Sequence, residues 1–149
     1  MRFTTQAGLT LMEVVVTVAI LGILAAIGTP MLLSNISAAR AVDAQNTLKS
    51  IYLMQKNYYA ENYCYLVTAG KGDYTSVINQ VLFSSANPGS GPIKTGLAND
   101  FYFYILPGTV GSTGSCTGQN SNDYTVYAQS RSNMNVVYSI DQQNIKAGF

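Results

Sequence analysis

The N-terminal part of the chain contains a long, almost wholly apolar stretch from Leu9 to Leu33. Residues 14–27 read VVVTVAILGILAAI without a charge, and the apolar character continues through Met31, Leu32 and Leu33. A helix rises about 1.5 Å per residue, so such a stretch can cross the roughly 30 Å hydrocarbon core of a bilayer. The pattern predicts a transmembrane helical segment over residues 9–33.

Beyond this stretch the apolar residues recur at helical spacing. The apolar positions are Ala41, Ala44, Leu48, Ile51 and Tyr58, with Arg40, Asp43, Lys49 and Lys56 between them. We expect one long helix from Leu9 to about Ala60. Its second half, residues 34–60, is too polar for lipid, so it should lie against a globular partner formed by the rest of the chain.

Three later segments have the composition of β-strands. They are residues 101–106 (FYFYIL), 123–130 (DYTVYAQS) and 134–141 (MNVVYSID). Each is rich in aromatic and β-branched residues, and the short link over residues 131–133 predicts that the last two form a hairpin. We therefore expect a small antiparallel sheet within residues 101–149.

Residues 61–100 have no sustained period and include the turn-rich run SSANPGSGPIKTG at residues 84–96, so they are expected to connect helix and sheet. A chain of 149 residues has room for one domain of ordinary size. The prediction is a single head over residues 34–149. Its fold class is α+β, with the long N-terminal helix packed against the antiparallel sheet.

The charge balance gives little support to nucleic-acid binding. Eight Lys and Arg stand against seven Asp and Glu, so no net field attracts a polyanion over long range. Lys71, Lys94, Arg131 and Lys146 could form a local DNA-binding stripe, but scattered solvated cations are the favoured interpretation.

The sequence argues against an enzyme. It has no histidine, no Gly-rich phosphate loop, no zinc-ligand spacing and no nucleophile elbow, so no cofactor is predicted. The run Asn120 to Asp123 could offer oxygen ligands to calcium, but with a single acid a plain turn is favoured and no metal site is predicted.

Aromatic residues cluster near the end of the predicted helix. They are Tyr52, Tyr58, Tyr59, Tyr63 and Tyr65. Such a cluster could form a binding or charge-conducting track, but core packing with hydroxyls at the rim is the favoured interpretation.

The two cysteines, Cys64 and Cys116, lie downstream of a hydrophobic export segment. One disulfide in an oxidising compartment is favoured over a metal site, and two unpaired buried thiols are the alternative. Closing a loop of this length stabilises a fold by about 4 kcal/mol in the chain-entropy model.

Glu13 is anomalous at the head of the apolar stretch. An ionised carboxylate inside a membrane helix costs about 2.5 kcal/mol or more, so it is rarely left there without a partner or a task. A secretory signal peptide fits poorly, because only Arg2 is basic and the apolar run is too long. A single-pass anchor with Glu13 near the interface is another alternative.

The run GLTLMEV at residues 8–14 resembles the processing motif of type IV prepilins and type II secretion pseudopilins. In that family a short polar leader ends in Gly, the next residue is usually Phe, and Glu occupies the fifth mature position. Gly8 and Glu13 match these positions, and Leu9 replaces the usual Phe. Gly22 and Pro30 match the family's helix-loosening positions.

The resemblance implies that a prepilin peptidase cuts between Gly8 and Leu9 and methylates the new amine of Leu9. Residues 1–8 would then be a leader peptide, and residues 9–33 would anchor the precursor in the inner membrane with its head in the periplasm. After assembly on an inner-membrane platform, with minor pilins as further partners, the pilin fold would join a homo-oligomeric extracellular filament.

Three functions remain open. The favoured one is a type IV pilus subunit serving adhesion, twitching motility or DNA uptake. The alternatives are a pseudopilin of a type II secretion system and a membrane-tethered binding module that does not polymerise.

Processing would give Glu13 a physical task. Cleavage creates a cationic amine on Leu9, which Glu13 of a neighbouring, axially offset helix can neutralise. Register would then be selected electrostatically, because lipid tails compete equally well for the apolar side chains. Since Pro30 lacks an N–H, we also expect a kink or melted stretch between Gly22 and Pro30.

Overall fold

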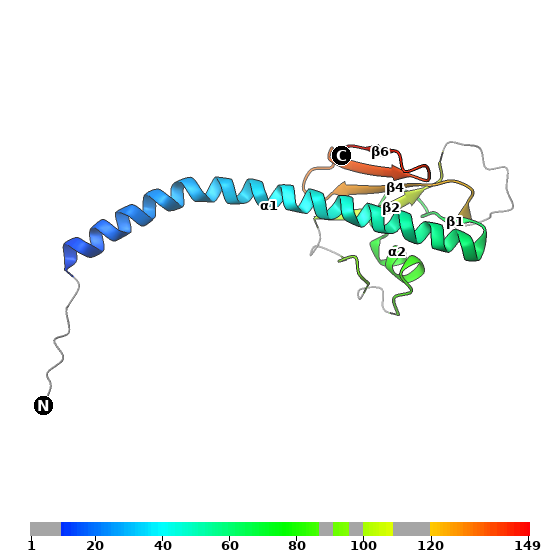
Figure 1. The fold of residues 1–149 in the computed structure, drawn as a ribbon, viewed down its shortest axis with the longest axis horizontal. Coiled ribbons are helices and arrows are strands. Elements are labelled where there is room, and N and C mark those ends of the chain that lie inside the picture. The colour runs from blue at the N-terminus through cyan, green and yellow to red at the C-terminus, as the bar shows by residue number, and fades with distance from the viewer. Residues whose placement is uncertain (1–9, 87–90, 96–99, 109–119) are drawn as a thin grey trace, which may run out of the picture. The chain divides into compact units, whose positions relative to one another are not determined.

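The computed structural model of the chain describes residues 10–86, 91–95, 100–108 and 120–149. Two helices and six strands lie within these residues (Figure 1). The helices are α1 (Leu11–Asn62) and α2 (Thr75–Leu82), and the strands are β1 (Tyr65–Leu66), β2 (Phe101–Leu106), β3 (Asn120–Ser121), β4 (Thr125–Ser130), β5 (Val137–Asp141) and β6 (Lys146–Ala147). The predicted α+β class, with a long N-terminal helix and a small antiparallel sheet, is confirmed.

The chain divides into two compact units. The first ends at Ala39 and contains the apolar part of α1. The second begins at Arg40 and contains the remainder of α1, α2 and the six strands. We refer to this second unit as the head.

Both ends of α1 have identifiable caps. At the start, the Thr10 hydroxyl accepts a hydrogen bond from the backbone N–H of Glu13 at 3.3 Å, which makes Thr10 the N-cap residue. At the end, Tyr63 adopts a left-handed conformation with φ of 57° and donates its N–H to the carbonyl of Tyr59 at 2.8 Å. This is the usual way for a helix to satisfy its last carbonyls, although glycine is more common at that position.

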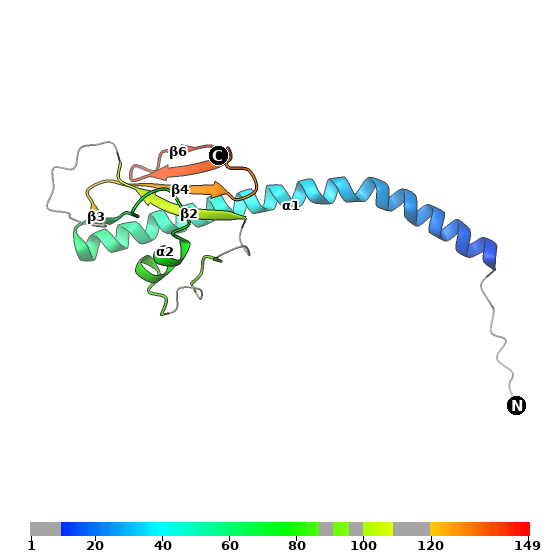
Figure 2. The same ribbon diagram turned by 180° about the vertical axis from the view of Figure 1, so that it is seen from behind.

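The four-stranded sheet has the order β2-β4-β5-β6, and every neighbouring pair is antiparallel. Its inner face packs on the part of α1 that belongs to the head. Figure 1 shows this part of α1 in front of the sheet, and Figure 2, seen from behind, shows the sheet in front of the helix. The core contains Leu48 and Ile51 of α1 together with Phe103, Val126 and Ile140 of the sheet, all with no exposed area.

Threonine side chains cover the outer edge of β2. The backbone N–H of Thr68 donates to the carbonyl of Ile105 at 2.7 Å, and the Thr68 hydroxyl accepts the Ile105 N–H at 3.1 Å. The Thr75 hydroxyl accepts the Phe103 N–H at 3.2 Å in the same way. These bonds replace a neighbouring strand, so they satisfy the backbone groups that an open edge would expose.

Two fully buried amides fasten the loops to the helices. The Gln55 side chain donates to the carbonyl of Leu66 at 2.7 Å and accepts the Leu66 N–H at 3.0 Å. Asn79 of α2 makes the same pair of bonds to Ile93, at 2.7 and 3.1 Å. Each amide therefore satisfies the N–H and the carbonyl of one buried residue, as the backbone of a neighbouring strand would.

The structure corrects the sequence prediction in two places. The segment 61–100 was expected to be a connector, but it contains β1 and α2. The strands expected over 123–130 and 134–141 begin later, at Thr125 and Val137. The residues before them form turns: Asp123 is bonded to Ser121 and Gly108, and the Val136 N–H donates to the carbonyl of Asn133.

Candidate assembly site

The apolar part of α1 exposes its side chains. Leu11, Ile27 and Met31 are 83%, 69% and 70% exposed, and their large apolar neighbours between residues 11 and 33 are exposed as well. Among the described residues, α1 is the helix that is long and apolar enough to cross a membrane, and none of its most apolar window is buried. A core helix of a soluble protein would bury such side chains. This segment therefore suits lipid or other apolar helices.

Glu13 is the charged residue of this apolar segment. It lies in the first turn of α1, its side chain is exposed, and no ion pair reaches it from the described part of the chain. No charged residue lies between it and Arg40. The partial positive charge at a helix N-terminus favours a carboxylate in this turn, but in an apolar environment that interaction leaves most of the desolvation cost uncompensated.

The hydroxyls of the apolar segment are satisfied within the helix. Thr17 donates to the carbonyl of Val14 at 2.9 Å, and Thr29 donates to that of Ala25 at 2.7 Å. Because of these bonds, each threonine hydroxyl keeps a hydrogen-bond acceptor when the helix is surrounded by lipid. They leave Glu13 as the polar group in the segment that needs an external partner.

The helix is continuous through Gly22 and Pro30. A Cβ placed on Gly22 would meet nothing within 4 Å, so within the chain itself no close contact requires glycine there. The kink or melted stretch expected between the two residues stays a prediction.

The processing residues Gly8 and Leu9 lie outside the described residues, and so does Cys116. Cys64 is partly buried and lies between the end of α1 and β1. The cleavage, the methylation and the Cys64–Cys116 disulfide therefore stay predictions.

The tyrosine cluster belongs largely to the core. Tyr65 is buried, and Tyr52 and Tyr58 pack against the core. Tyr59 stacks on Tyr65 with ring centroids 4.6 Å apart. Tyr63 differs, because 78% of it is exposed. The arrangement agrees with packing of the helix end rather than with a continuous buried track.

Tyr124 is a core residue that sequence reasoning missed. It is 1% exposed, and its ring lies 4.6 Å from that of Tyr65. Burial, followed by the nearby Tyr52, Tyr65 and Asp141, raises the pKa of Tyr124 far above its ordinary value, so the phenol stays protonated. It lies in the predicted strand 123–130, but the inward direction of a side chain beside a turn depends on register, which the sequence pattern did not fix.

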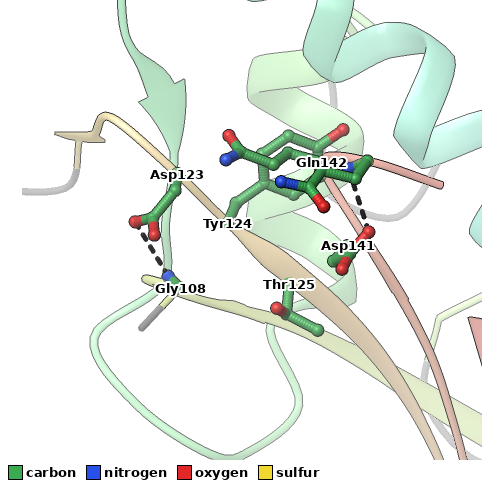
Figure 3. Close-up of a pocket in the computed structure, with 7 residues that line it drawn as sticks. Gly108, Asp123, Tyr124, Thr125, Asp141 and Gln142 are labelled. Atoms are coloured by element: carbon green, nitrogen blue, oxygen red, sulfur yellow. Dashed lines mark hydrogen bonds between the residues drawn. The ribbon is translucent and has the colours of Figure 1, made fainter. Parts of the chain in front are cut away.

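A small pocket of about 100 Å³ lies between the turns that precede β4 and follow β5. Figure 3 shows Asp123 turned toward the backbone of Gly108, with Asp141 on the other side of the pocket. Asp123 accepts the Gly108 N–H at 3.0 Å, and Asp141 accepts the N–H groups of Gln143 and Ile145 at 2.9 and 2.8 Å. Both carboxylates therefore serve to fold turns.

The described residues contain no group of three His, Cys, Asp or Glu side chains that could hold a metal ion. The structure does not describe the side chain of Asn120, which begins the run considered for calcium. Asp123 acts in that run as a turn residue, bonded to the hydroxyl of Ser121 at 3.3 Å.

Of the four basic residues considered for DNA, Arg131 is engaged in the fold. It forms an ion pair with Asp73 and lies over the ring of Tyr102 at 5.3 Å. Burial alone would raise the pKa of the Asp73 carboxyl, but the hydrogen bonds from Thr75 and Arg131 outweigh it and hold the pKa below its ordinary value. Lys71, Lys94 and Lys146 are exposed.

Comparison with known proteins identifies the N-terminal motif. Residues 4–29 match the family model described as the prokaryotic N-terminal methylation motif. The chain is 32% identical over 77 residues to the type IV major pilin protein PilA of Myxococcus xanthus, a match that covers 52% of this chain and 31% of that protein. It is 37% identical over 65 residues to the type II secretion system core protein G of Pseudomonas aeruginosa, covering 44% of this chain and 46% of that protein.

The matches thus span less than half the length of both relatives, and no solved structure matches the chain. The matched residues 4–29 include Gly8, Leu9 and Glu13, whose roles in processing and assembly stay predictions. The long apolar helix followed by a small antiparallel sheet is the expected layout. The chain therefore carries the prokaryotic N-terminal methylation motif, and over part of its length it is similar to a type IV pilin and to a type II secretion pseudopilin.

Proposed function

We propose that this chain is the structural subunit of a type IV pilus, assembled through α1 after the leader is removed, and that it is not an enzyme. The observation that carries the proposal is Glu13, a lone carboxylate in the first turn of an exposed apolar helix and inside the methylation motif. A prepilin peptidase would cut between Gly8 and Leu9 and methylate the Leu9 amine. Adhesion, twitching motility and DNA uptake are the roles such a filament would serve.

Charge pairing supplies the assembly mechanism. The Leu9 amine and the Glu13 carboxylate would both enter the apolar centre of a helix bundle, where an unpaired charge is heavily penalised. When the helices are correctly staggered, the carboxylate of one subunit meets the amine of the next, and both penalties fall together. The exposed apolar side chains would supply adhesion between helices, and the charge pair would select the register.

The proposal includes the route to the filament. Before assembly the precursor would be held in the inner membrane by residues 9–33, with its head in the periplasm and Cys64 joined to Cys116. Its partners would be further copies of the chain, the peptidase, the assembly platform and minor pilins. The net charge of +1 gives no support to nucleic acid as a partner.

The test is expression of the full chain with a peptidase-positive assembly system. We expect Glu13→Ala to be cleaved at Leu9 but poorly incorporated into filaments, because the change removes the partner of the amine and leaves the cleavage site. Mass spectrometry of the N-terminus and electron microscopy of sheared material give the two measurements.

Thr17→Ala is a matched control, since it removes a polar group of the same helix whose hydroxyl bonds only within α1. It should assemble like the parent chain. Normal fibres built solely from Glu13→Ala subunits would contradict the register mechanism. A mature protein that retains Met1 would contradict processing.

A pseudopilin of a type II secretion system is the second candidate, favoured by the similarity to core protein G. It would share the N-terminal chemistry and differ in fibre length. Long surface fibres support the pilus, whereas short fibres that form only with a secretion system support the pseudopilin. A chain that is cleaved and methylated but never polymerises would instead be a membrane-tethered binding module.

A further inference from the structure

A groove crosses the head between α1 and the chain that follows α2. Asp43, Asn46, Thr47 and Ser50 line it from α1, and Phe83 and Ile93 line it from the other side. Its volume of about 210 Å³ lies below the roughly 300–1,000 Å³ of a typical small-molecule site. The groove therefore suits one or two side chains of a protein better than a cofactor.

The far wall of the groove is held in place before anything binds. The fully buried Asn79 side chain bonds both backbone groups of Ile93. Gly91 approaches so closely that a Cβ there would lie 2.2 Å from Asn79 Cγ. A wall fixed in this way loses little conformational entropy when a partner side chain enters.

On another part of the head, two exposed apolar residues stand on either side of a lysine in the sequence. Ile145 and Phe149 are 61% and 46% exposed, and the Lys146 ammonium lies 5.8 Å from the Phe149 ring. We call Ile145 to Phe149 the C-terminal tip. It is also preformed, because the Asp141 carboxylate accepts the Ile145 N–H at 2.8 Å and the Asp141 N–H donates to the Ile145 carbonyl at 3.1 Å.

The two surfaces belong to opposite sides of the head. The tip carries β6, which is one edge of the sheet, whereas α2 is bonded through Thr75 to β2, which is the other edge. Both views place β6 and α2 on opposite sides (Figures 1 and 2). A chain that carries an exposed apolar segment on one side and a groove on the other can make head-to-tail contacts, which extend into an open assembly when the rotation does not close.

We propose that the groove of one copy receives the C-terminal tip of a neighbouring copy in the filament. An apolar side chain of the tip enters between Phe83 and Ile93, and Lys146 faces Asp43 of the receiving copy. The charges are complementary, and Asp43 makes no ion pair within the described parts of the chain. The inference rests on the proposed filament function and adds to it a second contact, between heads, that is independent of Glu13.

Charge reversal tests the pairing in filaments of the full chain. Asp43→Lys and Lys146→Asp should each lower the yield of pelletable filaments about threefold or more, since an attraction becomes a repulsion in every subunit contact. The double variant should recover most of the yield. Glu61→Lys and Lys71→Asp are matched controls, because they make the same charge changes at exposed residues outside both surfaces.

A cysteine pair tests the geometry without relying on charge. Filaments of the Ser50→Cys, Ile145→Cys double variant should give a ladder of covalent oligomers after mild oxidation, and filaments of either single variant should not. Both residues are exposed, so these changes should leave the head folded.

Failure of this inference differs from failure of the proposed function. If the parent chain forms filaments but the reversed pair gives no rescue and the cysteine pair gives no ladder, the tip-and-groove contact is wrong and the filament function stands. If the processed parent forms no filaments with an assembly system, the proposed function fails and this contact fails with it.

Discussion

At the scale of single residues, polar side chains in this protein act mostly on backbone. Asp73 illustrates this, because its carboxylate accepts hydrogen bonds from the N–H of Thr75 at 3.2 Å and from the Thr75 hydroxyl at 2.6 Å. The same carboxylate forms an ion pair with Arg131, which follows β4. The Thr75 hydroxyl in turn accepts the N–H of Phe103. One carboxylate thus links the start of α2 to the edge of the sheet.

This arrangement predicts how stability depends on pH. The folded-state pKa of Asp73 is below its ordinary value of 3.8, so the folded state holds the ionised form more strongly than the unfolded state does. Its contribution is present above pH 3.8 and is lost as the pH falls through the folded-state pKa. We expect Asp73→Asn to be less stable than the parent at pH 7, with the difference narrowing below about pH 4.

Urea unfolding of the detergent-solubilised chain at a series of pH values measures this difference. Asp141→Asn is a useful comparison, because Asp141 folds a separate turn beside the start of β4, whereas Arg131 follows the end of that strand, and no ion pair involves Asp141 among the described residues. A difference for Asp73→Asn that is constant from pH 7 to pH 3 would show that the carboxylate acts only as a neutral hydrogen-bond acceptor.

At the scale of elements, the joint between α1 and β1 depends on one side chain. Gln55 is fully buried and satisfies both backbone groups of Leu66. We expect Gln55→Ala to lower the free energy of unfolding by roughly 2 to 4 kcal/mol, because it leaves a buried donor and a buried acceptor without partners. Chemical denaturation followed by circular dichroism gives the value.

The control is Gln80→Ala on the exposed side of α2, where the same change should alter stability by less than about 0.5 kcal/mol. If Gln55→Ala costs no more than Gln80→Ala, the Leu66 backbone must find water or another partner when the amide is removed.

Elements with a local pattern could be predicted from the sequence, and elements that depend on distant partners could not. The long helix and the strand at Phe101–Leu106 carry their own periodicity and composition. The helix α2 was missed because it has only eight residues, and three of its first four are β-branched. Both features give a weak helical signal. The buried amides of Gln55 and Asn79 bond the backbone of Leu66 and Ile93, which lie 11 and 14 positions further along the chain. Neither partner belongs to a segment with a regular sequence pattern.

The same distinction holds for the candidate site: some of its residues could be recognised from the sequence, and others could be recognised only from the fold. Glu13 could be found from sequence because a carboxylate beside a charge-free apolar run is anomalous wherever it occurs. The groove and the tip could not be found, since Ile93 and Ile145 read as ordinary loop residues until the fold places them. The sequence gives the chemical type of each side chain, but the neighbours that lie far away in the sequence are known only from the fold.

At the scale of the whole molecule, the chain combines an apolar helix suited to burial among like helices with a head that has its own core. The two depend on different physics. In the proposed function, assembly through α1 would depend on apolar surroundings and one charge pair, whereas the head is held by its core and by the buried amides of Gln55 and Asn79. We therefore expect changes in the head core to alter subunit stability, and changes at Glu13 to alter assembly alone.

The predicted disulfide concerns the whole head, because it would join the end of α1 at Cys64 to the chain between β2 and β3 at Cys116. A cross-link over such a loop restricts the unfolded chain and stabilises the fold by about 4 kcal/mol in the chain-entropy model. We expect the exported protein to resist alkylation until it is reduced and denatured, and its head to unfold at a lower temperature after reduction. The Cys64→Ser, Cys116→Ser double variant should match the reduced parent, and reductant should not lower its stability further. Two thiols that react with an alkylating agent in the unreduced, denatured protein would exclude the bond and leave the head dependent on its core alone.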